Sequence, residues 1–200
     1  METKLILVRH GETDINVGGK MHKVSDPERL NRNGREQITK AAKKLKDIGI
    51  DCVYASSEKR ANESAKIISK ICKVSLQFVE GVEERNWGEY SNTTWPELKV
   101  ILDHLTYKQR FAFKPPGGES LTEFEERLGK AIKTIINLNR GKKVALVSHG
   151  GAIRVMIGFL LNLPPKDRFK LEPPNASITI LNHDEKHFKP QTFLSTTHLA

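Results

Sequence analysis

Two histidines in this chain share one sequence context, an apolar run that ends in histidine and glycine. The first run, LILVRHG, ends with Arg9 and His10, and the second, VALVSHGG, ends at His149. A histidine side chain supplies a nucleophile or a proton donor near neutral pH. An arginine guanidinium holds phosphoryl oxygens through a planar, bidentate fork. Together these residue types indicate chemistry on a phosphoryl group or a similar oxyanion.

Strands and helices must bring these residues together. The two apolar runs are typical of buried strands in a parallel sheet, whose carboxyl ends share one edge where ligands bind. A third stretch, VYASSEKRA, leads to Arg60 in the first turn of a helix, from which its side chain reaches back over that edge. Glycine follows each histidine, which lets the backbone approach a ligand, and the helix that begins after Gly151 turns its free N–H groups toward an anion. We therefore expect one phosphate-sized site at this edge.

Strands alternate with amphipathic helices along the chain, which indicates an α/β fold with a largely parallel sheet and helices on both faces. We predict one domain over residues 1–200, a three-layer α/β/α sandwich. The predicted strands are Lys4–Val8, Cys52–Ala55, Leu76–Val79 and 142–148, and residues 175–193 are predicted to form a closing hairpin. The predicted helices are Arg35–Ile48, with Asn31 as its cap and Gly49 as its stop, Glu58–Ile71, Leu121–Leu138 and Ala152–Leu161.

Residues 80–120 have a different character. They hold both tryptophans, a Pro-Pro pair and a Gly-Gly pair, without a sustained apolar period. We interpret this stretch as a less regular insertion that covers one end of the sheet as a lid. Its aromatic residues either pack the lid down, which we favour, or stack on a ring of the substrate; they are Trp87, Tyr90, Trp95, Tyr107, Phe111 and Phe113.

Composition restricts the class of protein. The 200 residues carry a net charge of +9, but the lysines are spread among acidic residues and no basic aromatic motif for nucleic acid is present. No apolar run approaches the roughly 20 residues that span a bilayer, and the N-terminal apolar stretch is too short for a signal peptide. Cys52 and Cys72 are expected to be free thiols. We expect a cytoplasmic protein that binds a small phosphorylated substrate, no nucleic acid and no membrane, with a homodimer left open.

Six segments in order resemble the histidine phosphatase superfamily, also called the phosphoglycerate mutase-like family. They are LVRHGETDIN, LNRNGREQ, VYASSEKRANESA, VEERNWGEY, PPGGESLTEFEER and VALVSHGGAIR, and NASIT resembles the closing strand. The resemblance covers essentially the whole chain. One arginine-histidine-glycine triplet is a weak signal, whereas six segments in the family's order are a strong one. The segment GKMHKVSDPERL departs from the family's usual glycine-arginine-x-glutamine-glycine, which affects the expected contacts with the leaving group.

The resemblance implies a role for each matching residue. His10 matches the nucleophile that becomes phosphohistidine, and Glu84 matches the general acid, with Glu83 as the neighbour that competes for this assignment. The other residues implied to bind or stabilise the phosphoryl group are Arg9, Asn16, Arg60, His149 and Gly150.

The physical chemistry of these residue types agrees with such roles. Nearby cations keep His10 unprotonated and therefore nucleophilic, while its other ring nitrogen needs a hydrogen-bond acceptor that fixes the tautomer. The two arginines and a protonated His149 stabilise the negative charge of the phosphoryl group in flight. Glu84 protonates the leaving oxygen and then takes a proton from water. No step needs a metal or another cofactor.

The phosphatase branch fits the chain length better than the mutase branch, whose members carry a longer insertion after the acid. We therefore predict a metal-independent phosphomonoester hydrolase for small phosphorylated metabolites, of the broad-specificity or α-ribazole phosphatase kind. A cofactor-dependent phosphoglycerate mutase is the alternative. A binding protein that has lost activity is less consistent with the sequence, because both the nucleophile and the acid are present.

Overall fold

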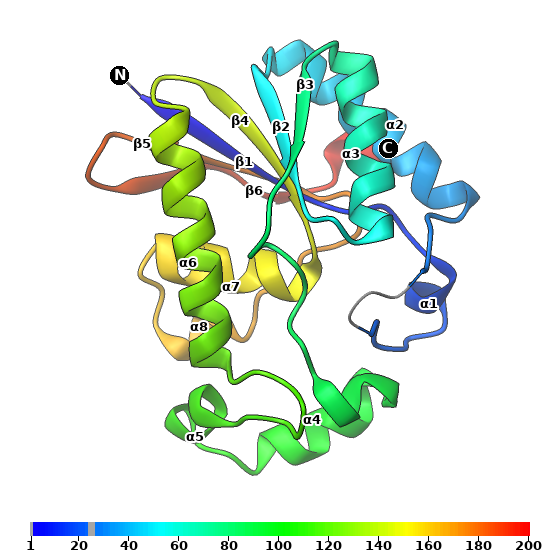
Figure 1. Ribbon diagram of the computed structural model, residues 1–200, viewed down its shortest axis with the longest axis vertical. Coiled ribbons are helices and arrows are strands. Elements are labelled where there is room, and N and C mark those ends of the chain that lie inside the picture. Colours follow the sequence, from blue (N-terminus) through cyan, green and yellow to red (C-terminus); the bar gives the residue numbers. More distant parts are fainter. Residues whose placement is uncertain (1, 24–26) are drawn as a thin grey trace.

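The computed structural model describes residues 2–23 and 27–200, and in this part of the chain six strands form one sheet (Figure 1). The strands are β1 (Thr3–Arg9), β2 (Cys52–Ala55), β3 (Ser75–Phe78), β4 (Lys143–Ser148), β5 (Ile178–His183) and β6 (Phe188–Ser195). Their order across the sheet is β3-β2-β4-β1-β5-β6. The first four strands in this order are parallel, and the predicted hairpin, β5 and β6, adds two antiparallel strands.

Two pairs of helices cover the two faces of the sheet and complete the predicted three layers (Figure 1). Helices α2 (Arg32–Ile48) and α3 (Lys59–Cys72) pack on one face, and α6 (Leu121–Leu138) and α7 (Gly150–Leu160) pack on the other. Side chains alternate along β1: Ile6 and Val8 face the first pair, whereas Leu5 and Leu7 face the second. The central strands are buried on both faces for this reason, which explains their continuous apolar runs.

Most predicted boundaries lie within one or two residues of the observed ones, and Cys52–Ala55 and Leu121–Leu138 match. Helix α2 begins three residues earlier than predicted. Its predicted cap is confirmed, because the Asn31 side chain accepts a hydrogen bond from Gly34 N at 2.8 Å, and the helix ends at Gly49 with φ of 72°. Helix α7 begins two residues earlier than predicted, at Gly150. Both cysteines are free, as predicted.

The lid segment, residues 80–120, is more regular than the sequence analysis predicted. It contains the 3₁₀ helix η1 (Gly88–Asn92) and two helices, α4 (Trp95–Asp103) and α5 (Tyr107–Ala112). Each α-helix begins with a capping box, Thr94 with Glu97 and Thr106 with Gln109. The two helices form the lower end of the molecule in Figure 1, below the sheet, where Trp87, Leu98 and Leu102 make a small core of their own.

The remaining short elements are α1 (Asp14–Val17), α8 (Pro165–Arg168) and η2 (Thr197–Leu199). No helix in the described residues is both long and apolar enough to pass through a lipid bilayer.

Candidate active site

The two histidines meet at the carboxyl edge of the sheet. Strands β1 and β4 are neighbours, and Arg9 pairs with Ser148 in their parallel register, so the next residues, His10 and His149, leave the sheet side by side. Their ring centroids lie 5.3 Å apart, and the two residues are 2% and 0% exposed. Parallel pairing therefore brings together two side chains that are far apart in sequence.

Two arginines flank these rings, and we call Arg9, His10, Arg60 and His149 the phosphoryl pocket. Arg60 comes from the first turn of α3 and is 1% exposed. Arg9 donates from Nη1 to the carbonyl oxygen of Pro173 at 2.8 Å, whereas its buried Nε makes no hydrogen bond within the described residues. Burial lowers the pKa of Arg9 to about 10, and the positive charge of Arg60 contributes to this lowering. Such a buried cationic cluster favours an anionic ligand.

The His10 ring is held in one tautomer. Its Nδ1 lies 2.7 Å from the carbonyl oxygen of Gly11, which can only accept, so Nδ1 carries the hydrogen and Nε2 keeps its lone pair. Burial first, then the charges of Arg60 and Arg9, lowers the pKa of His10 well below its usual value. The imidazole is therefore neutral and can attack an electrophile through Nε2.

His149 lies in a polar network that the sequence analysis did not identify. Its Nε2 is 2.9 Å from Ser56 Oγ and 3.3 Å from Glu58 Oε2, while its buried Nδ1 makes no hydrogen bond within the described residues. Burial, followed by Arg60 and His10, lowers the pKa of His149 well below its usual value. The protonated form of His149 is therefore disfavoured when the pocket holds no anion. Its protonation beside a bound phosphoryl group stays a prediction.

Glu58 is a buried carboxylate in direct contact with the phosphoryl pocket. It is the N-cap residue of α3, but its side chain makes no capping bond; instead Oε2 forms an ion pair with Arg60 and approaches His149. Burial raises the pKa of this carboxyl group to about 7, against the opposing effect of Arg60. The sequence contains little indication that Glu58 contacts the phosphoryl pocket, because a glutamate before a helix is normally a solvated capping residue.

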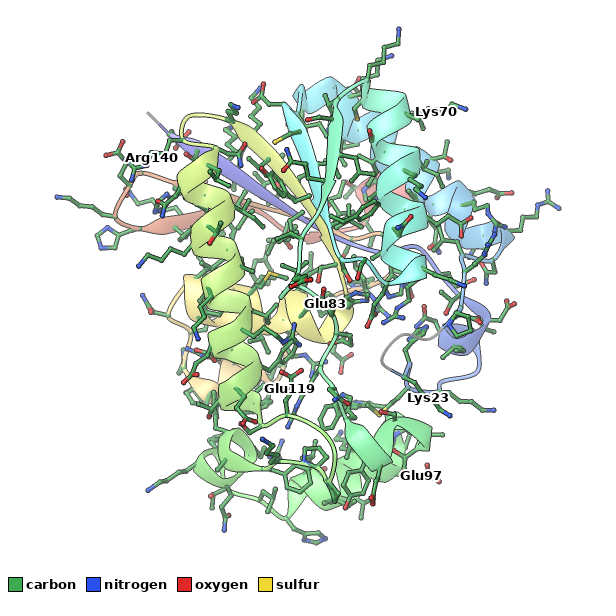
Figure 2. All side chains as sticks on the ribbon, in the orientation of Figure 1. Lys23, Lys70, Glu83, Glu97, Glu119 and Arg140 are labelled. Atoms are coloured by element: carbon green, nitrogen blue, oxygen red, sulfur yellow. The ribbon has the colours of Figure 1, made fainter. Side chains whose placement is uncertain are left out.

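Glu84 reaches the pocket and Glu83 does not. Glu84 Oε2 accepts a hydrogen bond from Gly151 N at 2.8 Å, which places its carboxylate at the start of α7. Glu83 instead contacts Arg127 at 3.3 Å and accepts from Gly81 N at 2.8 Å. Figure 2 labels Glu83 at the centre of the molecule, where the chain leaves the sheet for the lid segment. Of the two candidates for the general acid, the geometry favours Glu84.

The glycines of the two motifs are explained mainly by contacts within the protein, not by a ligand. A β-carbon on Gly11 would lie 2.3 Å from the carbonyl oxygen of Gly34, so the loop after β1 packs directly on the backbone of α2. A β-carbon on Gly151 would lie 2.4 Å from Glu84 Oε1. Close packing on α2 and on the Glu84 carboxylate thus explains Gly11 and Gly151. The approach of a ligand to the backbone at Gly150 stays a prediction.

Asn16 and an unpredicted residue, His22, complete one side of the site. Asn16 Oδ1 accepts from the Thr13 backbone and hydroxyl, each at 3.2 Å, and from Asn175 Nδ2 at 3.1 Å. Its Nδ2 hydrogens are therefore the donors that it can present to a ligand. His22 contacts Thr13 Oγ1 through Nε2 at 3.0 Å, and its ring centroid is 5.7 Å from that of His10. It belongs to the departing segment GKMHKVSDPERL, of which residues 24–26 lie outside the described residues.

A cavity of about 480 Å³ connects the phosphoryl pocket with the lid segment. Its inner end is lined by the phosphoryl-pocket residues Arg9, His10 and Arg60, and its outer part by Trp87 and Trp95 of the lid segment. The cavity is larger than one phosphoryl group, so it can also hold the group that the phosphate is attached to. No cluster of three or more metal-binding side chains occurs in the described ranges.

The lid aromatics mainly pack against one another and against neighbouring elements. Tyr90 and Phe113 pack on the small core around Trp87, and the Tyr107 ring stacks on Phe169 with centroids 5.8 Å apart. This agrees with the favoured interpretation of the sequence. Trp95 differs in its exposure of 37%, and it lines the cavity together with Trp87 and Phe111.

Comparisons with known proteins agree with this geometry. A profile described as histidine phosphatase superfamily (branch 1) matches residues 5–196. A probable phosphoglycerate mutase GpmB from Erwinia tasmaniensis is 29% identical over 190 residues, which cover 91% of this chain and 86% of that protein.

Solved structures with the same fold include two phosphatases. The structure of a phosphoserine phosphatase mutant from Entamoeba histolytica, in complex with phosphoserine, has a TM-score of 0.83 and 29% identity, covering 99% of this chain and 100% of that chain. A mycobacterial glucosyl-3-phosphoglycerate phosphatase complexed with VO3 has a TM-score of 0.83 over 95% of this chain and 98% of that chain. Its identity of 23% makes this second likeness one of fold alone.

Proposed function

This chain belongs to the histidine phosphatase superfamily, branch 1, and from that premise we propose that it hydrolyses phosphomonoesters through a phosphohistidine on His10. The observation that carries the proposal is the state of this ring. Its Nδ1–H donates to the Gly11 carbonyl oxygen at 2.7 Å, which leaves the lone pair of Nε2 for phosphorus. Two arginines beside it, the buried Arg60 and the partly buried Arg9, are placed to hold the phosphoryl oxygens.

In the first step, Nε2 of His10 forms a bond to phosphorus while the bond from phosphorus to the ester oxygen breaks. The negative charge on the equatorial oxygens is stabilised by Arg9 and Arg60 and by the N–H groups at the start of α7, Gly150 first. Glu84 in its acid form gives a proton to the leaving oxygen, which departs as an alcohol.

In the second step, the Glu84 carboxylate takes a proton from water, the water oxygen attacks phosphorus, and the bond from nitrogen to phosphorus breaks. Inorganic phosphate leaves, and His10 and Glu84 regain their starting protonation. The step needs water beside Glu84, and the cavity lined by that residue provides the space.

His149 contributes through Nδ1, which makes no hydrogen bond within the described residues and which can donate to a phosphoryl oxygen once the ring is protonated. A bound dianion favours the protonated imidazole because it replaces the repulsion of the arginines by attraction. Glu58, 3.3 Å from Nε2, provides a counter-charge on the far side of the ring. In this proposal His149 therefore gains its charge together with the substrate.

The proposed substrates are small phosphorylated metabolites, of the broad-specificity or α-ribazole phosphatase kind, with no metal and no other cofactor. The second candidate function is a cofactor-dependent phosphoglycerate mutase, and the relative from Erwinia is named a probable phosphoglycerate mutase. The two functions differ in the acceptor of the phosphoryl group, which is water in a phosphatase and a second substrate hydroxyl in a mutase.

Product analysis with 3-phosphoglycerate separates the two functions. We expect inorganic phosphate and glycerate to accumulate without 2-phosphoglycerate, whether or not 2,3-bisphosphoglycerate is added. Net isomerisation primed by the bisphosphate would overturn the phosphatase proposal in favour of the mutase. Vanadate, which copies the five-coordinate state of phosphorus, is expected to inhibit hydrolysis in competition with substrate.

A further inference from the structure

Two charged residues behind the site hold the backbone around the general acid. Arg127 lies on α6, and its guanidinium donates from Nη2 to the carbonyl oxygen of Glu84 and from Nη1 to that of Glu83, each at 3.3 Å. The same guanidinium binds the Glu119 carboxylate, with Nη2 at 2.6 Å from Oε1 and Nε at 3.2 Å from Oε2. Figure 2 labels Glu83 and Glu119 beside α6. We call Arg127 and Glu119 the acid clamp.

Glu119 holds the chain on the other side of the acid. Its Oε1 accepts a hydrogen bond from Asn86 N at 2.9 Å, and its own N donates to the carbonyl oxygen of Asn86 at 3.0 Å. Arg127 therefore binds the two residues up to and including Glu84 directly, and it binds Asn86 through Glu119. Residues 83–86 are in this way attached to a single helix.

That helix is a fixed part of the fold. Phe124 and Leu128 of α6 are 1% and 0% exposed in the core between the helix and the sheet. The Arg127 guanidinium carbon lies 4.9 Å from the centroid of the Phe124 ring. A β-carbon on Gly81 would lie 3.2 Å from that of Ala131, so the chain already packs on α6 before it reaches the acid. The acid clamp thus connects the acid to one of the best-packed elements of the molecule.

The position of the Glu84 backbone decides where its carboxylate can reach. Oε2 accepts from Gly151 N and Oε1 accepts from Arg85 N, each at 2.8 Å, which places the carboxylate at the start of α7. A general acid must lie within hydrogen-bond distance of the oxygen that it protonates. A displacement of about 1 Å can reduce the rate by roughly a hundredfold. Release of residues 83–86 from α6 would allow such a displacement.

The acid clamp is placed to act through Glu84 and not through the substrate. The arginines that line the cavity include Arg9, Arg60 and Arg154, whose guanidinium carbon lies 5.5 Å from the centroid of the Trp95 ring. Arg127 and Glu119 are not among the described residues that line it. Both side chains of the clamp are partly exposed, and ion pairs of this kind contribute little to global stability. Variants of the clamp are therefore expected to fold.

We propose that the acid clamp positions the general acid: Arg127 and Glu119 hold residues 83–86 against α6 and thereby keep the Glu84 carboxylate within reach of the leaving oxygen. The inference rests on the proposed function, because it assumes that Glu84 gives its proton to that oxygen. It adds to that function two positioning residues that do not touch the substrate.

The dependence on the leaving group distinguishes positioning from a merely structural role. Arg127→Gln is expected to lower kcat/KM for glycerol 3-phosphate by roughly ten- to a hundredfold, but for 4-nitrophenyl phosphate by less than about threefold, because nitrophenoxide leaves without a proton. Arg127→Lys keeps the charge without the planar fork and should recover part of the loss. Glu119→Gln removes the ion pair from the other side and provides a second variant with the same expected selectivity.

The matched control is a different ion pair between the lid segment and α6. Lys114 contacts Glu123 at 2.6 Å, and Lys114→Gln should change neither kcat/KM value by more than about twofold. When Arg127→Gln is added to Glu84→Gln, the further loss on glycerol 3-phosphate should stay below about threefold, because the group that the clamp positions is already absent. Unchanged values for Arg127→Gln, equal losses on the two substrates, or losses that multiply in the double variant would overturn the inference and leave the phosphatase proposal intact.

A measurement without turnover separates the inference from the proposed function. The Gly151 amide proton is donated to Glu84 Oε2, so its NMR resonance reports on the position of the carboxylate. We expect Glu84→Gln to move this resonance to lower chemical shift, Arg127→Gln to move it in the same direction, and Lys114→Gln to leave it in place. An unchanged resonance in Arg127→Gln would overturn the acid clamp. The expected shifts in a chain that hydrolyses neither ester would support the clamp and overturn the phosphatase proposal.

Discussion

The phosphoryl pocket and the lid segment occupy two ends of one cavity but are built in opposite ways. The pocket residues leave adjacent strands and the start of α3, and the side chains of His10, Arg60 and His149 are almost fully buried. The lid segment has a core of three buried residues, and much of its apolar surface faces solvent, with Val100 63% and Tyr107 47% exposed. One end is fixed by the whole sheet, whereas the other is held by a few local contacts.

Polar contacts hold the lid segment together and attach it to α6. Arg85 donates from Nη2 to the carbonyl oxygens of Phe113 at 2.8 Å and Glu119 at 3.1 Å, and Arg127 contacts Glu119 at 2.6 Å. In Figure 2, Glu119 lies between α6 and the lid helices, and Glu97 lies among those helices. In the proposed function, phosphoryl chemistry thus depends on a rigid element, whereas leaving-group selection depends on one that can vary at low cost to the fold.

The largest effect is expected for the nucleophile. His10→Ala should lower kcat for phenyl phosphate by roughly a thousandfold or more, because no other group replaces the nitrogen that attacks phosphorus. Circular dichroism should show an unchanged fold. Residual turnover above about a tenth of the wild-type value would remove His10 from its assigned role.

The general acid should distinguish leaving groups. Glu84→Gln is expected to lower kcat/KM by roughly a hundred- to a thousandfold for alkyl phosphates, and much less for 4-nitrophenyl phosphate, whose oxide leaves without a proton. Glu83→Gln is the matched control and should change either value less than about threefold. Equal losses on both substrates in Glu84→Gln would reassign the acid.

The lid core should affect substrate binding more than chemistry. Leu98→Ala removes buried volume from a core of three residues, and local stability should fall by about 2–4 kcal/mol. We expect KM for 3-phosphoglycerate to rise by roughly fivefold or more, with a smaller change in kcat for phenyl phosphate. Val100→Ala, on the exposed side of the same helix, should change neither value. Similar kcat losses on both substrates would contradict the separation of the two ends.

At Glu58 we expect an effect on stability that depends on pH. Its pKa is raised to about 7 by burial, so the folded state binds a proton that the unfolded chain releases near pH 4.5. The stabilisation is complete below the unfolded pKa and is lost as pH rises through 7. The free energy of unfolding of Glu58→Gln, measured in urea relative to that of wild type, should therefore rise by on the order of 2 kcal/mol from pH 5 to pH 8.

A carboxylate of the lid segment provides the opposite case. Hydrogen bonds from Thr94 lower the pKa of Glu97, so this group is ionised across the same pH range in both states. The difference between Glu97→Gln and wild type should not change between pH 5 and pH 8. If the free energy of unfolding relative to wild type changed with pH in the same way for both variants, burial of Glu58 in the pocket would not be the source of its effect.

Sequence reasoning predicted the sheet and the phosphoryl pocket because both depend on local patterns. Apolar runs define the central strands, and each ends directly at its functional residue, so parallel pairing alone places His10 beside His149. The lid helices were missed although their capping boxes, TWPE and TYKQ, are visible in the sequence. Their short apolar stripes are interrupted by proline and charge, which hides the helical period.

Three residues of the site had no usable local signal. Glu58, His22 and Arg154 are polar residues of ordinary type, on a helix start, a loop and an apolar helix. Each meets the site only through neighbours that are distant in sequence. Their proximity to the pocket depends on tertiary packing, which a single sequence does not reveal.

The most direct test of the account is to trap the phosphoryl group on His10. Because Glu84 activates water in the second step, Glu84→Gln should accumulate the intermediate when it is mixed with 4-nitrophenyl phosphate and quenched in alkali. We predict a burst of nitrophenol near one equivalent and an acid-labile phosphoryl group that peptide mass spectrometry assigns to His10. Turnover with no phosphorylated chain, or with the phosphoryl group on another residue, would contradict the account.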